Sequence, residues 1–239
     1  MNPVVSASHG SPDHNAYPNA LIQTSGFTAQ LAANPSYQHV DALAVLGKQQ
    51  HYRRGELLIR EGEVVDALYI VLQGRLRAFL ADDAGKELTL GVYGPREHMG
   101  EMSLDGKPHS SHVEALEVTT CSVVPHDALL AFIGARPEFA LELVGRLIRR
   151  ARLATEIARS VALTDVYGRL VRLLRQLATA PGPQGERRLS ERMTHQAIAR
   201  QLACSREMVS RLLRDLERGG YIAVKDRWIT LLKPLPARW

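Results

Sequence analysis

The chain has 239 residues, of which 45% are hydrophobic and 23% are charged, a balance typical of a globular protein rather than a disordered or fibrous one. No apolar run reaches the roughly 18 residues of a membrane-spanning helix, and two cysteines are too few for a disulfide framework, a zinc knuckle or a cysteine-bound iron–sulfur cluster. The formal net charge is +5, and the cysteine usage favours a reducing cytoplasm.

The charge is unevenly divided along the chain. Residues 166–239 contain 15 Lys and Arg against 6 Asp and Glu, whereas residues 1–165 contain 15 against 19. An acidic first part joined to a basic last part favours a sensing or scaffold domain followed by a domain that binds a polyanion.

The N-terminal half divides into an extension and a run of strands. Residues 1–39 are rich in Pro, Asn, Ser and His and lack the pattern of a secretory signal, so we expect a mobile extension. Short apolar runs follow, and Leu68–Leu72 and Leu76–Leu80 are predicted strands joined by a turn at Gln73–Arg75. A second hairpin turn is expected at Asp82–Lys86. Several such strands indicate a small barrel or roll.

A helical pattern runs from Pro137 to Gln176. Mostly small apolar residues recur in it at heptad spacing: Ala140, Val144, Leu147, Ala151, Ala154, Ala158 and Val161. The stripe predicts a dimer interface formed by two such helices; the alternative is a helix that packs only on its own domain. Phe139, Leu143 and Ile148, on a neighbouring face, are expected to make that intramolecular contact.

The basic C-terminal part predicts two short helices followed by a hairpin. Residues 179–188 are expected to form a Pro- and Gly-rich loop. Beyond it Thr194 is placed to cap one helix and Ser205 the next, with a tight turn at Ala203–Cys204. Residues 221–232 then read as a β-hairpin. This order of elements is a winged helix-turn-helix, whose second helix enters the major groove of DNA.

The second helix separates its side chains into two faces. On a helical wheel the apolar face is formed by Met208, Val209, Leu212, Leu213 and Leu216. The opposite face, close to the helix N-terminus, is formed by Arg206, Glu207, Ser210 and Arg211. Arg can donate two hydrogen bonds to guanine and Glu can accept one from cytosine, so this face can read G·C pairs. The alternative interpretation is a solvated, salt-bridged surface.

These segments together resemble the cyclic AMP receptor protein/FNR family of bacterial transcription regulators. The resemblance rests on "CSREMVSRLLRDLE", "TDVYGRLVRLL", "LIREGEVVDALYIVLQGRLRAFL" and "GEMSLDGKPHSSHVEA", and covers about residues 40–232. It implies an α+β fold with three parts after the extension: a cyclic-nucleotide-binding β-roll at residues 40–136, a dimerisation helix and hinge at 137–165, and a winged helix-turn-helix at 166–239.

The resemblance also implies a function. It implies a homodimeric, sequence-specific transcription regulator rather than an enzyme, with a pseudo-palindromic operator of TGTGA-like half-sites and RNA polymerase as partners, and no membrane. The residues that match the family's base readers are Arg206, Glu207 and Arg211, with Ser210 on the same face, and those that match its phosphate contacts are Thr194, Gln196 and Ser205. The residues expected at the dimer interface are Val144, Leu147, Ala151, Ala154, Ala158 and Val161.

The effector site implied by the family departs from its pattern at one point. The matching residues are Gly100, Glu101, Met102, His109, Ser110 and Ser111, with Arg150 and Thr155 contributed by the dimer helix. His109 stands where the family has an arginine that pairs with the cyclic phosphate. A neutral His cannot replace the charge or the bidentate geometry of Arg, so binding of cyclic AMP is expected to be weakened.

Three interpretations of the effector therefore stay open. Cyclic AMP or a similar mononucleotide is one. Cyclic di-GMP is another, because its two phosphates suit the arginines of the dimer helix: Arg149, Arg150, Arg152 and Arg159. The third is that no small ligand binds. A haem ligated by His98 is a separate and less favoured alternative. No metal is expected.

Two other functions are alternatives to the regulator. An enzyme is disfavoured because the chain contains no P-loop, HExxH or GxSxG motif. A non-specific architectural DNA binder would need basic charge but not an Arg–Glu–Arg reading face.

Overall fold

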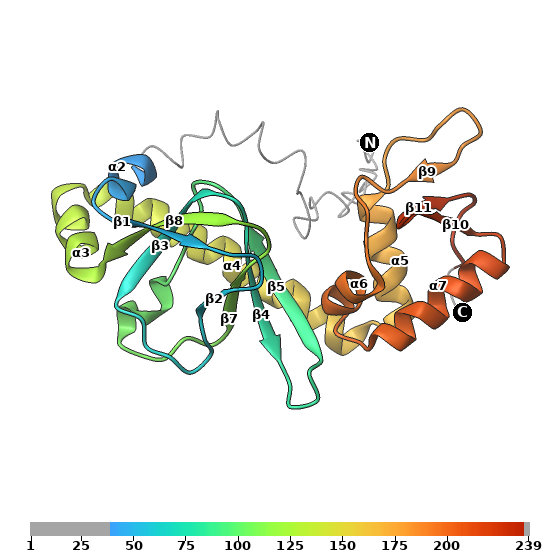
Figure 1. Ribbon diagram of the computed structural model, residues 1–239, viewed down its shortest axis with the longest axis horizontal. Helices are drawn as coiled ribbons and strands as arrows, with labels where there is room; N and C mark the ends of the chain where they lie inside the picture. Colours follow the sequence, from blue (N-terminus) through green and yellow to red (C-terminus); the bar gives the residue numbers. More distant parts are fainter. Residues whose placement is uncertain (1–38, 237–239) are drawn as a thin grey trace, which may run out of the picture.

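The computed structural model describes residues 39–236, so the predicted mobile extension at residues 1–39 lies almost wholly outside the described residues. The chain forms a β-roll and a C-terminal domain of helices with a small β-sheet, and one long helix runs along the roll toward the second domain (Figure 1). The helices of the roll and linker are α2 (Val40–Ala44), the 3₁₀ helix η2 (Glu101–Asp105), α3 (His126–Ala135) and α4 (Pro137–Leu163).

Eight strands in two antiparallel sheets make the roll. They are β1 (Lys48–Tyr52), β2 (Leu57–Ile59), β3 (Ala67–Gln73), β4 (Leu76–Ala81), β5 (Glu87–Tyr93), β6 (His98–Met99), β7 (His112–Ala115) and β8 (Thr119–Pro125). One sheet has the order β1-β8-β3-β6 and the other β2-β7-β4-β5. The predicted strands at 68–72 and 76–80 are confirmed as β3 and β4, and the predicted hairpin turn at 82–86 joins β4 to β5.

The roll has two apolar centres. One fills its interior and includes Ile59, Val71, Leu76 and Val113, because alternate residues of paired strands point to the same side. The other lies where α2, α3 and α4 cover β3 and β8, with Phe132 packed edge-on against Phe139. Phe139 and Leu143 are buried, as predicted.

The prediction for Ile148 was wrong. Ile148 is 46% exposed. It lies one residue beyond Leu147, which is 40% exposed, so both belong to the uncovered side of α4.

The helical stretch predicted to run to Gln176 is divided into two helices. α4 ends at Leu163, Thr164 is extended, and α5 (Val166–Leu177) begins after Asp165, whose Oδ1 accepts a hydrogen bond from the Gly168 amide at 2.6 Å. The Asp165 cap satisfies a backbone amide that a continuous helix would have paired internally, so it favours the start of a new helix at Val166.

The second domain contains α5, α6 (His195–Leu202), α7 (Arg206–Arg218), β10 (Ile222–Lys225) and β11 (Trp228–Leu231). A short strand β9 (Arg187–Arg188) pairs with β11, so the end of the segment predicted as a loop is part of a three-stranded sheet of order β10-β11-β9. The apolar faces of all three helices and of the hairpin meet in one core that includes Leu170, Ile198, Leu216 and Ile229.

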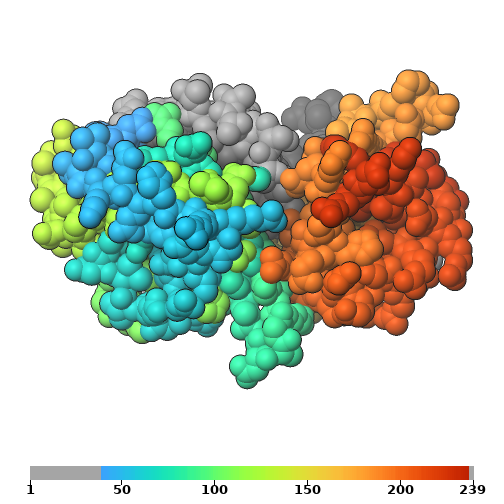
Figure 2. Space-filling view, viewed as in Figure 1, coloured from blue at the N-terminus to red at the C-terminus, as the bar shows by residue number. Residues whose placement is uncertain are grey.

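The two domains contact each other through β5 and α6. Arg200 of α6 forms an ion pair with Glu87 of β5, with Nε–Oε2 at 3.0 Å and Nη2–Oε1 at 3.1 Å. Figure 2 shows the tip of the β4–β5 hairpin projecting from the roll beside the second domain. Within the part of the chain that the structure describes, none of the helices combines the length and hydropathy needed to cross a bilayer.

Candidate functional site

The N-terminus of α7 is built by a side-chain cap. Ser205 has extended backbone, and its Oγ accepts a hydrogen bond from the Met208 amide at 3.2 Å. Ala203, two residues before Ser205, has a φ of +50°, which turns the chain sharply between α6 and α7. Both the predicted cap and the predicted turn are confirmed, and together they fix where the first turn of α7 begins.

The side chains of α7 divide as the helical wheel predicts. Val209, Leu212, Leu213 and Leu216 are buried in the domain core. Arg206, Glu207 and Arg211 are exposed. Among the described residues none of the three forms an ion pair, and Arg211 donates only to the sulfur of Met208, at 3.0 Å. The alternative of a salt-bridged surface is therefore not what the structure contains.

Ser210 lies on the same face, but its hydroxyl is already engaged. Its Oγ donates to the Arg206 carbonyl at 2.9 Å and lies 2.7 Å from Nδ1 of His195, the first residue of α6. Because the hydroxyl proton is used by the carbonyl, the imidazole is the donor to Oγ. Sequence reasoning missed His195, since only the fold brings the start of α6 against the first turns of α7.

The residues matched to phosphate contacts lie at the starts of the two helices. Thr194 caps α6, its Oγ1 accepting from the Ala197 amide at 3.0 Å, which confirms the predicted cap. Thr194, Gln196 and Ser205 are all exposed. A hydroxyl that accepts from a backbone amide still has its own proton to donate, so capping and contact with a phosphate oxygen are compatible.

The predicted hairpin is the wing. Val224 pairs with Ile229 and Lys225 with Trp228, and the turn residues Asp226 and Arg227 both have positive φ, +51° and +66°. Two positive φ values in a two-residue loop give the turn that matches the twist of the flanking strands.

Two arginines that sequence reasoning did not single out lie against the wing. The guanidinium of Arg188 lies 3.6 Å from the centroid of the Trp228 ring, and that of Arg192 lies 5.6 Å from it. The contact of these arginines with the indole face adds fixed positive charge to the wing. Only the pairing of β9 with β11 could have revealed it.

In the roll, the implied effector residues gather around η2. Gly100 precedes η2 with φ of +104°, and a Cβ added there would lie 2.3 Å from the Ala67 carbonyl oxygen. Glycine is thus required for two reasons, the left-handed backbone and the close approach of β3. The constraint holds Glu101, the next residue, inside the roll, where it is 7% exposed.

Glu101 is paired with the long helix. Arg150 of α4 donates to Glu101 Oε1 and to the His98 carbonyl, and Arg150 also lies over the Tyr93 ring. Burial alone would raise the pKa of Glu101, but His98 and the Arg150 guanidinium outweigh it and hold the pKa below its usual value. Glu101 Oε2 is buried and lies 3.4 Å from Nδ1 of His98 without a hydrogen bond to any group within residues 39–236, so this oxygen can still accept one from a hydroxyl.

Two buried histidines lie near this carboxylate. His98 is 1% exposed, and burial lowers its pKa to about 4, so the ring is neutral. His109 is 3% exposed and its pKa is also lowered by burial, which leaves no permanent cation at the position of the family's arginine. In the described part of the chain, neither nitrogen of His98 nor Nε2 of His109 has a hydrogen-bond partner.

The remaining implied effector residues are only partly brought together. Ser111 is 5% exposed and lies near His109, whereas Met102 and Ser110 are exposed and contact each other, Oγ to Sδ at 3.5 Å. Thr155 is exposed on α4, its hydroxyl donating to the Ala151 carbonyl at 3.0 Å. Across residues 39–236 no group of three or more His, Cys, Asp or Glu side chains is arranged to hold a metal.

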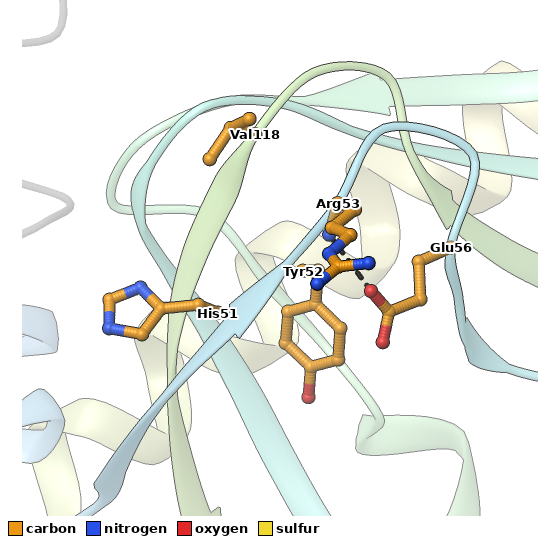
Figure 3. A pocket seen from close by; sticks show the side chains of 5 residues that line it. All are labelled: His51, Tyr52, Arg53, Glu56 and Val118. Carbon is orange, nitrogen blue, oxygen red and sulfur yellow. Dashed lines mark hydrogen bonds between the residues drawn. The ribbon is translucent and has the colours of Figure 1, made fainter.

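A hollow on the roll contains none of these residues. It is lined by His51, Tyr52, Arg53, Glu56 and Val118, which come from the end of β1, the turn after it and the loop before β8 (Figure 3). Glu56 accepts from the Arg53 amide at 2.9 Å, so its carboxylate closes the turn. We assign this hollow no part in the site.

The stripe on α4 faces away from the roll. Val144 is 49% exposed, Leu147 40% and Val161 41%, and Ala151, Ala154 and Ala158 are exposed. An uncovered apolar stripe of this length on a long helix is typical of a helix–helix interface.

Comparison with known proteins matches both domains. Residues 49–136 match the model of the cyclic nucleotide-binding domain, and residues 168–235 match the model of the Crp-like helix-turn-helix domain. A CRP-like cAMP-activated global transcriptional regulator of Mycobacterium tuberculosis is 32% identical over 196 residues, covering 80% of this chain and 88% of that protein. The cAMP-activated global transcriptional regulator CRP of Salmonella typhimurium is 27% identical over 186 residues, covering 75% and 87%.

Among solved structures, the c-di-GMP responsive global regulator CLP of Xanthomonas campestris has a similar fold. Its TM-score is 0.72 at 24% identity, and the match covers 81% of this chain and 98% of that one. At this identity the likeness concerns the fold alone. Taken with the sequence relatives and the α+β architecture, it confirms the predicted family: the chain belongs to the CRP/FNR family of DNA-binding transcription regulators, which are not enzymes.

Proposed function

We propose that the protein is a homodimeric, sequence-specific regulator that reads DNA with the N-terminal face of α7. The observation that carries the proposal is the exposed trio Arg206, Glu207 and Arg211, without ion-pair partners in the described residues, on a helix whose other face is buried. These groups supply the guanine and cytosine contacts of a G·C-reading surface. Thr194, Gln196 and Ser205 position the domain through phosphates, and Ser210 adds to base reading only when its internal hydrogen bonds open.

The test compares a TGTGA palindrome with a random duplex of equal length. Arg206→Ala and Arg211→Ala should each remove about 1–3 kcal/mol of discrimination, because each removes one bidentate guanine contact. Arg214→Ala is the matched control, since Arg214 is exposed on the same helix but beyond its N-terminal turns. Fluorescence anisotropy at several salt concentrations separates the salt-dependent, non-specific part of the affinity from the sequence-specific part. Equal loss of affinity on both duplexes would favour the architectural DNA binder.

The dimer is supported by the exposed stripe of α4. Two copies packed along Val144, Leu147, Ala151, Ala154, Ala158 and Val161 would place two copies of α7 for the two halves of a palindrome. Ala154→Glu should shift the protein toward monomer in sedimentation velocity, whereas Glu156→Ala, exposed on the same helix but outside the stripe, should not. The same proposal includes contact of the DNA-bound dimer with RNA polymerase and a location in the cytoplasm.

The effector is proposed to be a cyclic nucleotide bound in the roll, cyclic AMP or cyclic di-GMP. Names of relatives contain both. Oε2 of buried Glu101 forms no hydrogen bond among the described residues and suits a ribose hydroxyl, and the buried rings of His98, whose Nδ1 lies 3.4 Å from this oxygen, and of His109 give further polar groups in the same interior. The residues fit a weakly held phosphate better than a tightly paired one, because the two histidines are neutral.

Calorimetric titration with cyclic AMP, cyclic GMP and cyclic di-GMP tests the effector. Saturable heat with one of them that disappears in Glu101→Ala supports binding in the roll. Flat traces with all three would overturn the nucleotide-sensing part of the proposal, while leaving DNA reading by α7 intact.

A further inference from the structure

Ser210 and His195 join the reading face of α7 to the start of α6. Ser210 is half-buried and lies between Arg206 and Arg211 on the helical wheel. Its Oγ is 2.7 Å from Nδ1 of His195 and 2.9 Å from the Arg206 carbonyl oxygen, to which the hydroxyl donates. The hydroxyl therefore makes one hydrogen bond in each role, since it accepts from the imidazole and donates to the carbonyl.

These two hydrogen bonds differ in what their opening leaves unpaired. The Arg206 carbonyl also accepts from the Ser210 backbone amide in the helical ladder, so it stays paired when the hydroxyl proton turns away. Among the described residues Ser210 Oγ is the only hydrogen-bond partner of Nδ1 of His195. Opening that bond would leave the N–H of a half-buried ring without an acceptor, which costs more. The bond to the carbonyl is therefore the one that opens when Ser210 meets a base.

The bond that remains decides what the Ser210 hydroxyl presents to DNA. A hydroxyl has one proton and two lone pairs. The imidazole N–H occupies one lone pair, and the second lies beside the Arg206 carbonyl once the proton has turned toward the groove. The side facing DNA is then a donor, and the imidazole N–H on the same oxygen strengthens it, because hydrogen bonds in a chain polarise one another.

A donor on this face distinguishes bases in the major groove. Thymine presents the O4 acceptor there, and guanine presents O6 and N7. Cytosine presents only the N4 amino group, which is itself a donor. A hydroxyl that acts as a donor therefore favours thymine or guanine over cytosine at the base that it reaches.

We propose that His195 is a positioning residue for DNA recognition. Its imidazole holds Ser210 Oγ so that the hydroxyl acts as a donor, and Ser210 then selects thymine or guanine against cytosine at a base beside those read by Arg206 and Arg211. His195 acts through Ser210 and does not itself contact the base. The inference rests on the proposed reading of DNA by α7 and extends it to a residue of α6.

The experiment measures the affinity of the full-length protein for operator duplexes in which each base pair of the half-site is changed in turn. Fluorescence anisotropy should show a preference of about fivefold for thymine or guanine over cytosine at one position, the value expected for one neutral hydrogen bond. Ser210→Ala and His195→Phe should each remove this preference at that position alone. The double variant should lose no more than either single variant.

Three further variants provide the controls. His195→Asn should keep the preference, because its side-chain NH₂ takes the place of the Nδ1–H group. His195→Ala removes the N–H without adding bulk, so it should repeat the result of His195→Phe if the larger side chain disturbs folding. Gln196→Ala, at an exposed neighbour matched to a phosphate contact, should weaken binding to every duplex alike.

Each outcome bears on the proposal. Loss of the preference at one position in Ser210→Ala and His195→Phe, with its retention in His195→Asn, supports it. Equal weakening of all duplexes by His195→Phe and His195→Ala would make His195 a phosphate contact and overturn it. A preference for cytosine, or one that survives both of these variants, would also overturn it. Failure of the proposed function differs, because Arg206→Ala and Arg211→Ala would then weaken binding to every duplex equally.

Discussion

Arginine and glutamate occur together in two regions of this molecule and behave oppositely in them. On α7, Arg206, Glu207 and Arg211 are exposed and have no ion-pair partner in the described residues. In the roll, Glu101 is 7% exposed and its partner Arg150 closes over it from α4. An exposed charge without an ion-pair partner on a rigid helix is available to another molecule, whereas a buried and paired charge links elements of the fold.

The sharpest test of that contrast is a pair of substitutions that remove one arginine from each region. Arg150→Met should lower the free energy of unfolding by about 3 kcal/mol, because it leaves the buried Glu101 carboxylate without its cation. Arg211→Met should change it by about 0.5 kcal/mol or less, since its side chain is exposed. Urea denaturation measures both.

A double variant provides the control for Arg150. Arg150→Met/Glu101→Gln removes the stranded charge as well as its partner, so it should be more stable than Arg150→Met alone. Equal destabilisation by Arg150→Met and Arg211→Met would show that the two regions do not differ in this respect.

The second prediction uses pH to separate the buried region from the exposed one. His98 has a pKa of about 4 in the fold against 6.5 for the unfolded chain. Between these values the unfolded state binds the extra proton, so stability is full above pH 6.5 and falls as the pH drops toward 4, by up to about 3 kcal/mol. His98→Phe should flatten the profile in that window.

Other titratable groups near His98 also contribute to the pH dependence of stability. Burial lowers the pKa of His109, which acts in the same direction, and raises that of Glu97, which acts in the opposite one. His98 also helps to hold the pKa of Glu101 down, so the difference between wild type and His98→Phe reports the coupled pair of His98 and Glu101. If the pH dependence of stability is unchanged by the substitution, water reaches the His98 ring in the folded state and the ring is protonated there with an ordinary pKa.

Sequence periodicity was sufficient to predict the structure of the exposed region on α7, but not the contacts of the buried region in the roll. The two faces of α7, its Ser205 cap and the wing hairpin are local features, so spacing along the chain predicted them. The contact of Arg150 with Glu101 joins residues 49 apart in the chain, and that of His195 with Ser210 joins two helices. Such contacts depend on how elements pack, which the spacing of residues within one element does not contain.

The incorrect expectations have the same origin. The apolar pattern continues through residue 176, but the cap formed by Asp165 competes with a continuous helix and starts α5 anew. Ile148 has the hydrophobicity of a core residue and lies on the side of α4 that the roll does not cover. Composition likewise predicted the loop at 179–188, whereas Arg187 and Arg188 pair with a strand more than 40 residues away.

The third prediction concerns the cap that positions the exposed region. Ser205→Ala should cost about 1 kcal/mol of stability, because the Met208 amide loses its acceptor. Ser205→Gly should cost only a few tenths, since water reaches the amide. If DNA discrimination falls with Ser205→Ala more than with Ser205→Gly, the cap also sets the direction of Arg206. A loss of affinity that is equal on both duplexes and in both variants would assign the effect to the missing phosphate contact.

The smallest effect is expected where the two regions are joined, at the ion pair of Arg200 with Glu87. Arg200→Gln should lower stability by about 0.5 kcal/mol, because the Arg200 side chain is 35% exposed and partly solvated. Glu87→Gln should cost more, since Glu87 is also the partner of Arg77, whose side chain is 4% exposed. A double-mutant cycle measures the coupling directly. Coupling near zero would mean that the roll and α6 are held together by the packing of β5 alone. A clear coupling would make Glu87 the residue through which the buried charges of the roll act on the helices of the second domain.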